Sequence, residues 1–171
     1  MAAWNYYVIA ATYYSKRKDD MSDIHYSRII AALPDQVYIA SQQHPGEWDP
    51  FSRIPRGAAP KVGARVGSRV RIVAWHGLTM EVEYIQAQAP TRAAMKMVNG
   101  PRFLSAFAGT WRFLPHGQHA TLAHFDYHLR AAPGFRWLAP LMRFYFAWET
   151  RRRLNALAAY CEQLAAPLKA A

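Results

Sequence analysis

Residues 135–164 read FRWLAPLMRFYFAWETRRRLNALAAYCEQL, and no other part of the chain runs so far without a turn signal. The pair Pro133-Gly134 marks the beginning of this segment. Its first half is apolar on nearly every side. Its second half keeps one apolar stripe, made of Leu154, Leu157, Cys161 and Leu164, with Arg151, Arg152 and Arg153 off the stripe. A helix with one stripe covers one surface, whereas a helix that is apolar all round contacts more than one. We therefore expect a long helix that packs on a sheet and also faces something else.

Composition is typical of a folded chain with one sizeable core. The 171 residues are 52% hydrophobic and 14% aromatic, which is too apolar for a disordered protein. The single cysteine, Cys161, excludes a disulfide framework and a multi-cysteine metal site. Because Cys161 falls on the apolar stripe, we expect a buried, inert thiol rather than a nucleophile.

The formal net charge of +10 raises the question of a polyanionic partner. The basic residues are scattered, and they are dense only at Lys16-Arg17-Lys18 and Arg151-Arg152-Arg153. We interpret the charge mainly as solubility and weak non-specific attraction. This interpretation disfavours nucleic acid as a partner without excluding it.

The first twenty residues differ from the rest. The aromatic run Trp4–Tyr14 is too short to span a bilayer, and its basic residues follow it, where a secretory signal has them in front. We interpret residues 1–20 as an appended extension, disordered or an artefact of the choice of start site, with an interfacial anchor as the alternative. Residues 21–166 form the predicted domain, residues 167–171 a tail, and the expected location is the cytoplasm.

The order of elements begins with a strand over residues 24–32. A short helix follows from Pro34, and a second one is predicted with Asp49 as N-cap and Pro50 in its first turn. Residues 53–67 are loop-like, with several prolines and glycines. Five segments of strand length come next, over residues 68–76, 79–88, 91–99, 103–114 and 119–130, each separated by short turns.

Alternation inside these segments predicts a sheet with one polar and one apolar face. Arg69 and Arg71, for example, oppose apolar neighbours, and they are expected across from Glu81 and Glu83 in the next strand. Short connections between consecutive strands indicate an antiparallel meander. The chain is therefore predicted to be an α+β protein with a one-sided sheet and a long closing helix.

Several short segments carry a family resemblance. They are residues 32–38 (ALPDQVY), 48–51 (WDPF), 60–63 (PKVG), 109–113 (GTWRF) and the long final helix. Together they resemble the START-like, birch-pollen-allergen-like superfamily (SRPBCC), in particular its bacterial polyketide cyclase/dehydrase-like members. The resemblance spans residues 24–164 and implies the helix-grip fold: a curved antiparallel sheet with two short helices after its first strand, wrapped around a long C-terminal helix. It also implies a cavity between sheet and helix, and it supplies no catalytic motif.

The implied cavity gives a set of predicted ligand-binding residues from the apolar sheet face, the early turn and the final helix. They are Trp48, Phe51, Ile72, Val82, Tyr84, Met95, Met97, Phe107, Trp111, Phe125, Tyr127, Leu141, Tyr145 and Trp148. An apolar pocket with a few polar tips suits a hydrophobic or aromatic small molecule. The alternative is that these side chains fill one another. If a cavity exists, its entrance is expected near Pro140, which either lies in the first turn of the helix or kinks it.

Candidates for catalysis are few. His76 is in register with the apolar face of its strand and is a candidate general base at the cavity rim, while Tyr84 and Tyr127 are candidate proton carriers. The alternative for His76 is a purely structural strand-end position. Further candidates for polar ligand contacts are Tyr145, Asn99, Arg28 and Arg143.

One strand carries a metal-like pattern, His124, Asp126 and His128, on a single face. Residues two apart on a strand lie about 7 Å apart, which is wide for chelation by neighbours alone. The alternation places all three on the solvated outer face. We therefore expect no metal site there and no cofactor elsewhere.

The leading functional hypothesis is a cytoplasmic protein that binds a hydrophobic small molecule, a polyketide, lipid or quinone-like compound, between the sheet and the C-terminal helix. A polyketide cyclase/dehydratase-type enzyme acting in the same cavity is the alternative, and the sequence leaves open whether the protein is an enzyme. A ribosome- or RNA-associated basic protein is the second alternative.

Overall fold

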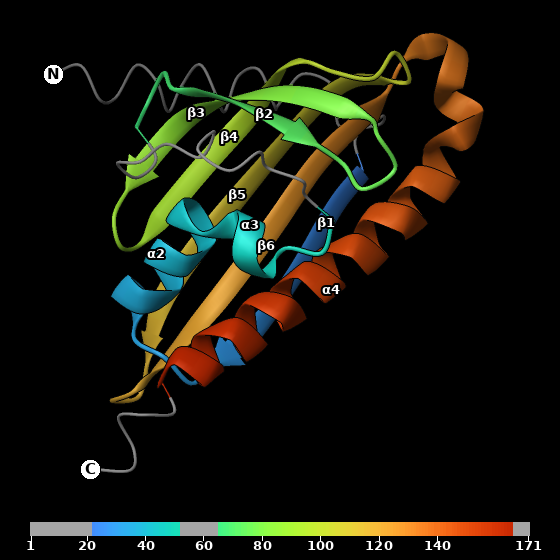
Figure 1. Ribbon diagram of the computed structural model, residues 1–171. Coiled ribbons are helices and arrows are strands. Elements are labelled where there is room, and N and C mark those ends of the chain that lie inside the picture. Colours follow the sequence, from blue (N-terminus) through green and yellow to red (C-terminus); the bar gives the residue numbers. More distant parts are fainter. Residues whose placement is uncertain (1–21, 52–64, 166–171) are drawn as a thin grey trace, which may run out of the picture.

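A curved sheet of six strands faces a long helix in the computed structural model, which describes residues 22–51 and 65–165 (Figure 1). The sheet order is β1-β6-β5-β4-β3-β2, and all neighbours are antiparallel. The strands are β1 (Ser22–Ile30), β2 (Arg69–Val73), β3 (Thr79–Gln88), β4 (Arg92–Asn99), β5 (Leu104–His116) and β6 (Ala120–Ala131). This confirms the predicted meander, with β1 added at its far edge beside β6.

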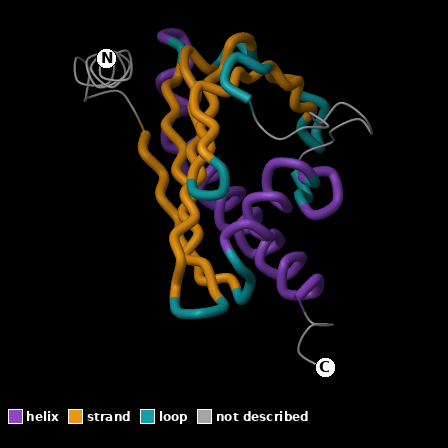
Figure 2. The backbone as a smooth tube through the Cα atoms, turned by 90° about the vertical axis from the view of Figure 1, so that its left-hand side faces the viewer, coloured by secondary structure: helices purple, strands orange, loops and turns teal. Residues whose placement is uncertain are grey.

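Two short helices and one long helix lie on the concave side of the sheet. They are α2 (Pro34–Gln43), α3 (Pro45–Trp48) and α4 (Ala139–Ala165), the last preceded by the 3-10 helix η2 (Pro133–Leu138). Figure 2 shows the sheet bending over the helices. This arrangement is the predicted helix-grip fold. Pro140 lies in the first turn of α4, one of its two predicted positions.

The second half of α4 packs on β1 and β6. Leu154, Leu157 and Cys161 are buried, as the stripe predicted, and burial raises the pKa of the Cys161 thiol to about 12. The stripe ends one turn earlier than predicted, because Leu164 lies in the last turn of the helix and is exposed. Arg153 is the larger correction. Its side chain is only 13% exposed and does not share the solvated position of Arg151 and Arg152.

The second short helix begins earlier than predicted. Pro45 starts α3 directly after α2, so the helix is already complete at Trp48, and Asp49 follows its end instead of capping its beginning. The Asp49 carboxylate accepts a hydrogen bond of 2.9 Å from the backbone N–H of Phe51. This turn directs Asp49 toward α4, which matters for the site.

The predicted alternation of faces is confirmed across the sheet. Arg69 pairs with Glu83 and Arg71 with Glu81 on the outer face, and Nε of Arg69 lies 3.3 Å from the Glu83 carboxylate. On the inner face, a Cβ atom on Gly109 would lie 3.3 Å from the ring of Tyr127. The absence of that atom lets the Tyr127 ring lie close to β5.

Some predictions fall on parts of the chain outside the described residues. These are the extension over residues 1–20, the PKVG segment with most of the predicted loop, and the tail over residues 167–171. Among the helices of residues 22–51 and 65–165, none combines the length and the apolar character needed to cross a membrane.

Candidate functional site

A cavity of about 470 Å³ lies between the inner face of the sheet and the helices. Its floor is aromatic: the rings of Trp111 and Phe125 stack with their centroids 3.8 Å apart, and Phe107 and Tyr127 lie with centroids 4.8 Å apart. Side chains of this size bury large apolar areas and hold defined positions. The cavity therefore has a rigid, apolar floor supplied by β5 and β6.

All but two of the predicted ligand-binding residues line this cavity; the exceptions are Met97 and Trp148. The Met97 side chain lies against Gly100 at the end of β4. Trp148 on α4 is 40% exposed and lies edge-on to Phe51 and beneath the guanidinium of Arg152. Neither side chain lines the cavity, in contrast to the implied placement. Ligand contact by the other residues stays a prediction.

The cavity opens between the start of α4 and the β2–β3 turn. The most exposed lining residues are Leu141 on α4 and His76, Leu78 and Thr79 in and after the turn. Leu141 directly follows Pro140, so this is the position where the sequence placed the entrance. A molecule in the cavity would enter past these side chains.

A buried charge cluster forms one wall of the cavity. Nη2 of Arg153 lies 3.0 Å from a carboxylate oxygen of Glu149, one turn earlier on α4, and Nε of Arg153 lies 3.4 Å from Oδ1 of Asp49. All three side chains line the cavity and are almost fully buried. Burial of charged groups without partners is strongly unfavourable, so the three residues hold one another in place.

Two tyrosines extend the cluster. The guanidinium of Arg153 donates a hydrogen bond of 2.8 Å to the hydroxyl of Tyr127, and Trp75 Nε1 donates one of 3.3 Å to the hydroxyl of Tyr145. Tyr145 is also hydrogen-bonded to the carboxyl group of Glu149. The polar wall therefore runs continuously from β6 through α4 to the entrance.

Burial sets the protonation of this wall. It raises the pKa of Glu149, while Arg153 acts in the opposite direction. Burial also raises the pKa of Tyr127 and of Tyr145, so both hydroxyls keep their protons. Arg153 stays charged, because the neighbouring Tyr127, Asp49 and Glu149 outweigh the effect of its burial on its pKa. The cavity thus offers a carboxyl group that is held toward its neutral form, a property found at functional sites.

The predicted catalytic candidates all line the cavity but differ in setting. His76 is exposed at the entrance, with its ring beside those of Trp75 and Tyr145. Tyr84 is buried away from the charge cluster; its hydroxyl donates to Gln42 at 3.0 Å, and burial raises its pKa to about 12. Tyr127 is part of the cluster. Three further polar candidates, Asn99, Arg28 and Arg143, do not line the cavity, and Arg28 donates instead to Asn155 on α4.

Sequence reasoning missed Asp49, Glu149 and Arg153 as site residues. The signal for two of them was present: Leu141, Tyr145, Glu149 and Arg153 are spaced by four along α4 and share one face. We continued that face with Trp148 because it is apolar. No spacing along the chain connects Asp49 to this face, since it comes from the turn after α3.

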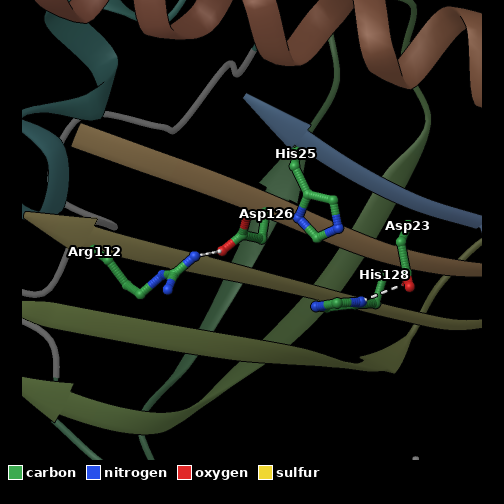
Figure 3. A network of polar contacts seen from close by, with 5 residues as sticks. All are labelled: Asp23, His25, Arg112, Asp126 and His128. Carbon is green, nitrogen blue, oxygen red and sulfur yellow. Dashed lines mark hydrogen bonds and ion pairs between the residues drawn. The ribbon is translucent and has the colours of Figure 1, made fainter. Parts of the chain in front are cut away.

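Two members of the metal-like pattern on β6, Asp126 and His128, belong to a polar network on the outer face of the sheet (Figure 3). Asp126 lies 2.8 Å from Nδ1 of His25 on β1 and 3.0 Å from Nη2 of Arg112 on β5, and Nδ1 of His128 lies 2.7 Å from Asp23. Within the described ranges, no three His, Cys, Asp or Glu side chains are placed to hold one metal ion. The network joins three strands on the outer face, as predicted, but Asp126 is buried there and not solvated.

Comparisons with known proteins agree with this fold. The sequence profile of the family described as polyketide cyclase / dehydrase and lipid transport matches residues 21–162. The chain therefore belongs to this family. A comparison with curated protein sequences gives no significant match.

Solved structures of low sequence identity share the fold. The Zhui aromatase/cyclase from Streptomyces sp. R1128 has a TM-score of 0.67 at 15% identity, covering 84% of this chain and 94% of its own. A START superfamily protein from Mycobacterium smegmatis has a TM-score of 0.63 at 13% identity, covering 83% and 98%. A point mutant of norcoclaurine synthase from Thalictrum flavum has a TM-score of 0.57 at 14% identity, covering 84% and 95%.

Proposed function

We propose that the protein binds a neutral hydrophobic small molecule, a polyketide, lipid or quinone-like compound, with a hydroxyl or carbonyl group directed at the Asp49–Glu149–Arg153 wall. The observation that carries this proposal is the cavity itself: about 470 Å³, apolar on the sheet side and polar along one wall of α4. That volume is in the range of small-molecule sites. The family's description, which names cyclases, dehydrases and lipid transport, supports a ligand-binding or cyclase role.

The charges of the wall favour a neutral ligand over an acid. Arg153 already faces two carboxyl groups, so its positive charge is balanced by Asp49 and is exceeded when Glu149 is also ionised. A ligand carboxylate would meet the like charge of Asp49, and that of Glu149 whenever Glu149 is ionised, in a poorly solvated space, which is unfavourable. A hydroxyl or carbonyl group can instead exchange hydrogen bonds with Tyr127, Tyr145 or Glu149.

Native mass spectrometry of the protein purified from its own source tests this proposal, and we expect a bound neutral molecule. Binding of 2-naphthol and of 2-naphthoate, followed by quenching of tryptophan fluorescence, tests the preference for neutral ligands. Because Trp111 lies in the cavity floor, 2-naphthol should quench and should bind at least about tenfold more tightly than the acid, a difference of about 1.4 kcal/mol. Tighter binding of the acid, or a co-purified anionic ligand, would contradict the proposal.

A second candidate function is a cyclase or dehydratase reaction in the same cavity, and Glu149 favours it. A carboxyl group with a raised pKa, next to the hydroxyl of Tyr145, suits a general base that removes a proton from the carbon beside a ligand carbonyl. The hydroxyls of Tyr127 and Tyr145 would then donate hydrogen bonds to the developing enolate oxygen. The enolate carbon would attack a second carbonyl of the same molecule, and the oxygen of that carbonyl would take up the proton held by Glu149.

Turnover of a poly-β-ketone substrate separates the two candidates. If the protein is an enzyme, Glu149→Gln should abolish cyclisation while the variant still binds 2-naphthol. Wild-type protein that binds such substrates and releases them unchanged would assign a binding role alone.

A further inference from the structure

We propose that the face of α4 beside the cavity entrance docks on the surface of an anionic membrane. This face is defined by Trp137, Leu141, Phe144 and Trp148, and we refer to it as the aromatic face. Trp137 is 76% exposed, Leu141 63% and Phe144 74%, although each is large and apolar. Their spacing of three and four residues places them side by side along η2 and α4. Contiguous exposed apolar side chains of this kind mark interaction surfaces.

The charged side chains that residues 133–153 expose beside the aromatic face have one sign. Between Pro133 and Arg153 the sequence contains five arginines and a single acidic residue, Glu149, which is buried in the cavity wall. Arg143, Arg151 and Arg152 are exposed, and the guanidinium of Arg152 lies 5.3 Å from the ring centroid of Trp148. Aromatic side chains flanked by arginines fit the boundary of a bilayer, where the rings enter the headgroup region and the cations meet anionic lipids.

The position of the aromatic face connects it to the entrance. Leu141 belongs to both, since it lines the cavity and is exposed. Figure 1 shows η2 and the first turns of α4 at one margin of the molecule, beside the β2–β3 hairpin. In that turn, Trp75 and Leu78 are also exposed apolar residues. A membrane docked here would face the cavity entrance, so an apolar molecule could pass between bilayer and cavity without crossing water.

A bilayer fits this face better than a second copy of the chain does. The formal charge of the chain is +10, and the exposed charges of this face are arginines, so two copies would bring like charges together. An anionic surface removes that repulsion and adds attraction. The docking proposal is independent of which molecule the cavity holds, because it rests on the outer side chains.

Sedimentation with vesicles tests the docking. The full chain is mixed with vesicles of phosphatidylcholine, with or without phosphatidylglycerol, at low and at physiological ionic strength. We expect binding to the anionic vesicles only, weakened by salt, together with a blue shift of tryptophan fluorescence as Trp137 leaves water. Trp137→Ser with Phe144→Ser should lower the partition coefficient by about tenfold or more. Arg143→Gln with Arg152→Gln should lower it by about fivefold per arginine.

Matched control variants distinguish docking by the aromatic face from non-specific adsorption to the vesicles. Ile39 on α2 and Leu114 on β5 are also exposed apolar residues, and Arg69 and Arg71 are exposed arginines on the outer face of the sheet. Ile39→Ser with Leu114→Ser, and Arg69→Gln with Arg71→Gln, should leave vesicle binding within about twofold of the wild type. The midpoint of thermal unfolding checks that every variant is folded.

Three results would overturn the proposal. The first is absence of wild-type binding to anionic vesicles at low salt, and the second is unchanged binding by the folded Trp137/Phe144 variant. The third is a partner of another class: a dimer that this variant converts to a monomer, or RNA binding without vesicle binding.

Discussion

Arg153 on α4 donates a hydrogen bond of 2.8 Å to the hydroxyl of Tyr127 on β6, inside the cavity. This bond joins the long helix to the sheet at the point where the apolar floor meets the charged wall. The sheet supplies the hydroxyl partner, while Asp49 and Glu149 supply the carboxyl groups. The site therefore depends on three separate parts of the chain being packed together.

Tyr127→Phe tests how much this bond contributes. The change removes one hydrogen-bond acceptor of the buried guanidinium, so we expect a loss of about 1–3 kcal/mol in the free energy of unfolding. Urea denaturation measures it. Tyr26→Phe on β1 is the control, because the Tyr26 hydroxyl makes no hydrogen bond to another of the described residues; its effect should be under about 0.5 kcal/mol. Equal effects of the two changes would contradict the assignment.

Glu149→Gln should make stability less dependent on pH. Burial raises the pKa of Glu149 in the folded protein above its unfolded value, so its protonated form favours folding. That contribution is fully present below the unfolded pKa, near 4.5, and is lost as pH rises through the folded pKa. Glutamine stays neutral at every pH, so the variant does not lose this stability as pH rises from the unfolded to the folded pKa of Glu149.

The measurement is the free energy of unfolding of both proteins between about pH 4 and pH 8. We expect the variant to gain stability relative to the wild type as pH rises. Groups distant from position 149 titrate alike in the two proteins, so their contributions cancel in the difference. A difference that is constant, or that falls with pH, would show that the ion pair with Arg153 outweighs burial.

Ala74→Phe should close the cavity from the sheet side. Ala74 lines the cavity at the end of β2, and its methyl group leaves room that a phenyl ring would take. We expect 2-naphthol affinity to fall by at least about tenfold, with unfolding free energy changed by less than about 1.5 kcal/mol, because the ring enters empty space rather than a filled core. Trp148→Ala is the control, since Trp148 does not line the cavity. A larger loss of affinity from Trp148→Ala would place the ligand elsewhere.

The fold could be predicted from sequence because each element buries only one face. This one-sided burial is visible in the sequence as polar and apolar residues that alternate along β3, β5 and β6. It is also visible in the apolar stripe from Leu154 to Cys161 on α4. The rule that apolar residues mark the buried face also caused the error at the site. It assigns every charged residue to solvent, so we predicted Trp148 as a cavity residue and did not predict Glu149 or Arg153.

Tertiary packing, and not the local sequence, determines which charged side chains are buried. Arg153 sits in a run of three arginines whose other two members are exposed, and only packing distinguishes it from them. Its partner Asp49 depends on where α3 ends, a boundary that the choice between Pro45 and Pro50 decides. Two prolines in similar contexts gave no local reason to prefer the first.

Asp126→Asn should destabilise the sheet without affecting the cavity. Asp126 is buried on the outer face and holds both His25 and Arg112, at 2.8 and 3.0 Å, from the two neighbouring strands (Figure 3). Asparagine keeps the shape but removes the charge, and we expect a loss of about 1–2 kcal/mol in unfolding free energy at neutral pH. The control is Asp23→Asn, whose partner is His128 and whose side chain is half exposed; its loss should stay below about 1 kcal/mol. Affinity for 2-naphthol should be unchanged in both variants, because neither residue lines the cavity. If Asp126→Asn weakened 2-naphthol binding as strongly as Ala74→Phe, the two faces of the sheet would be coupled and the site could not be confined to its concave side.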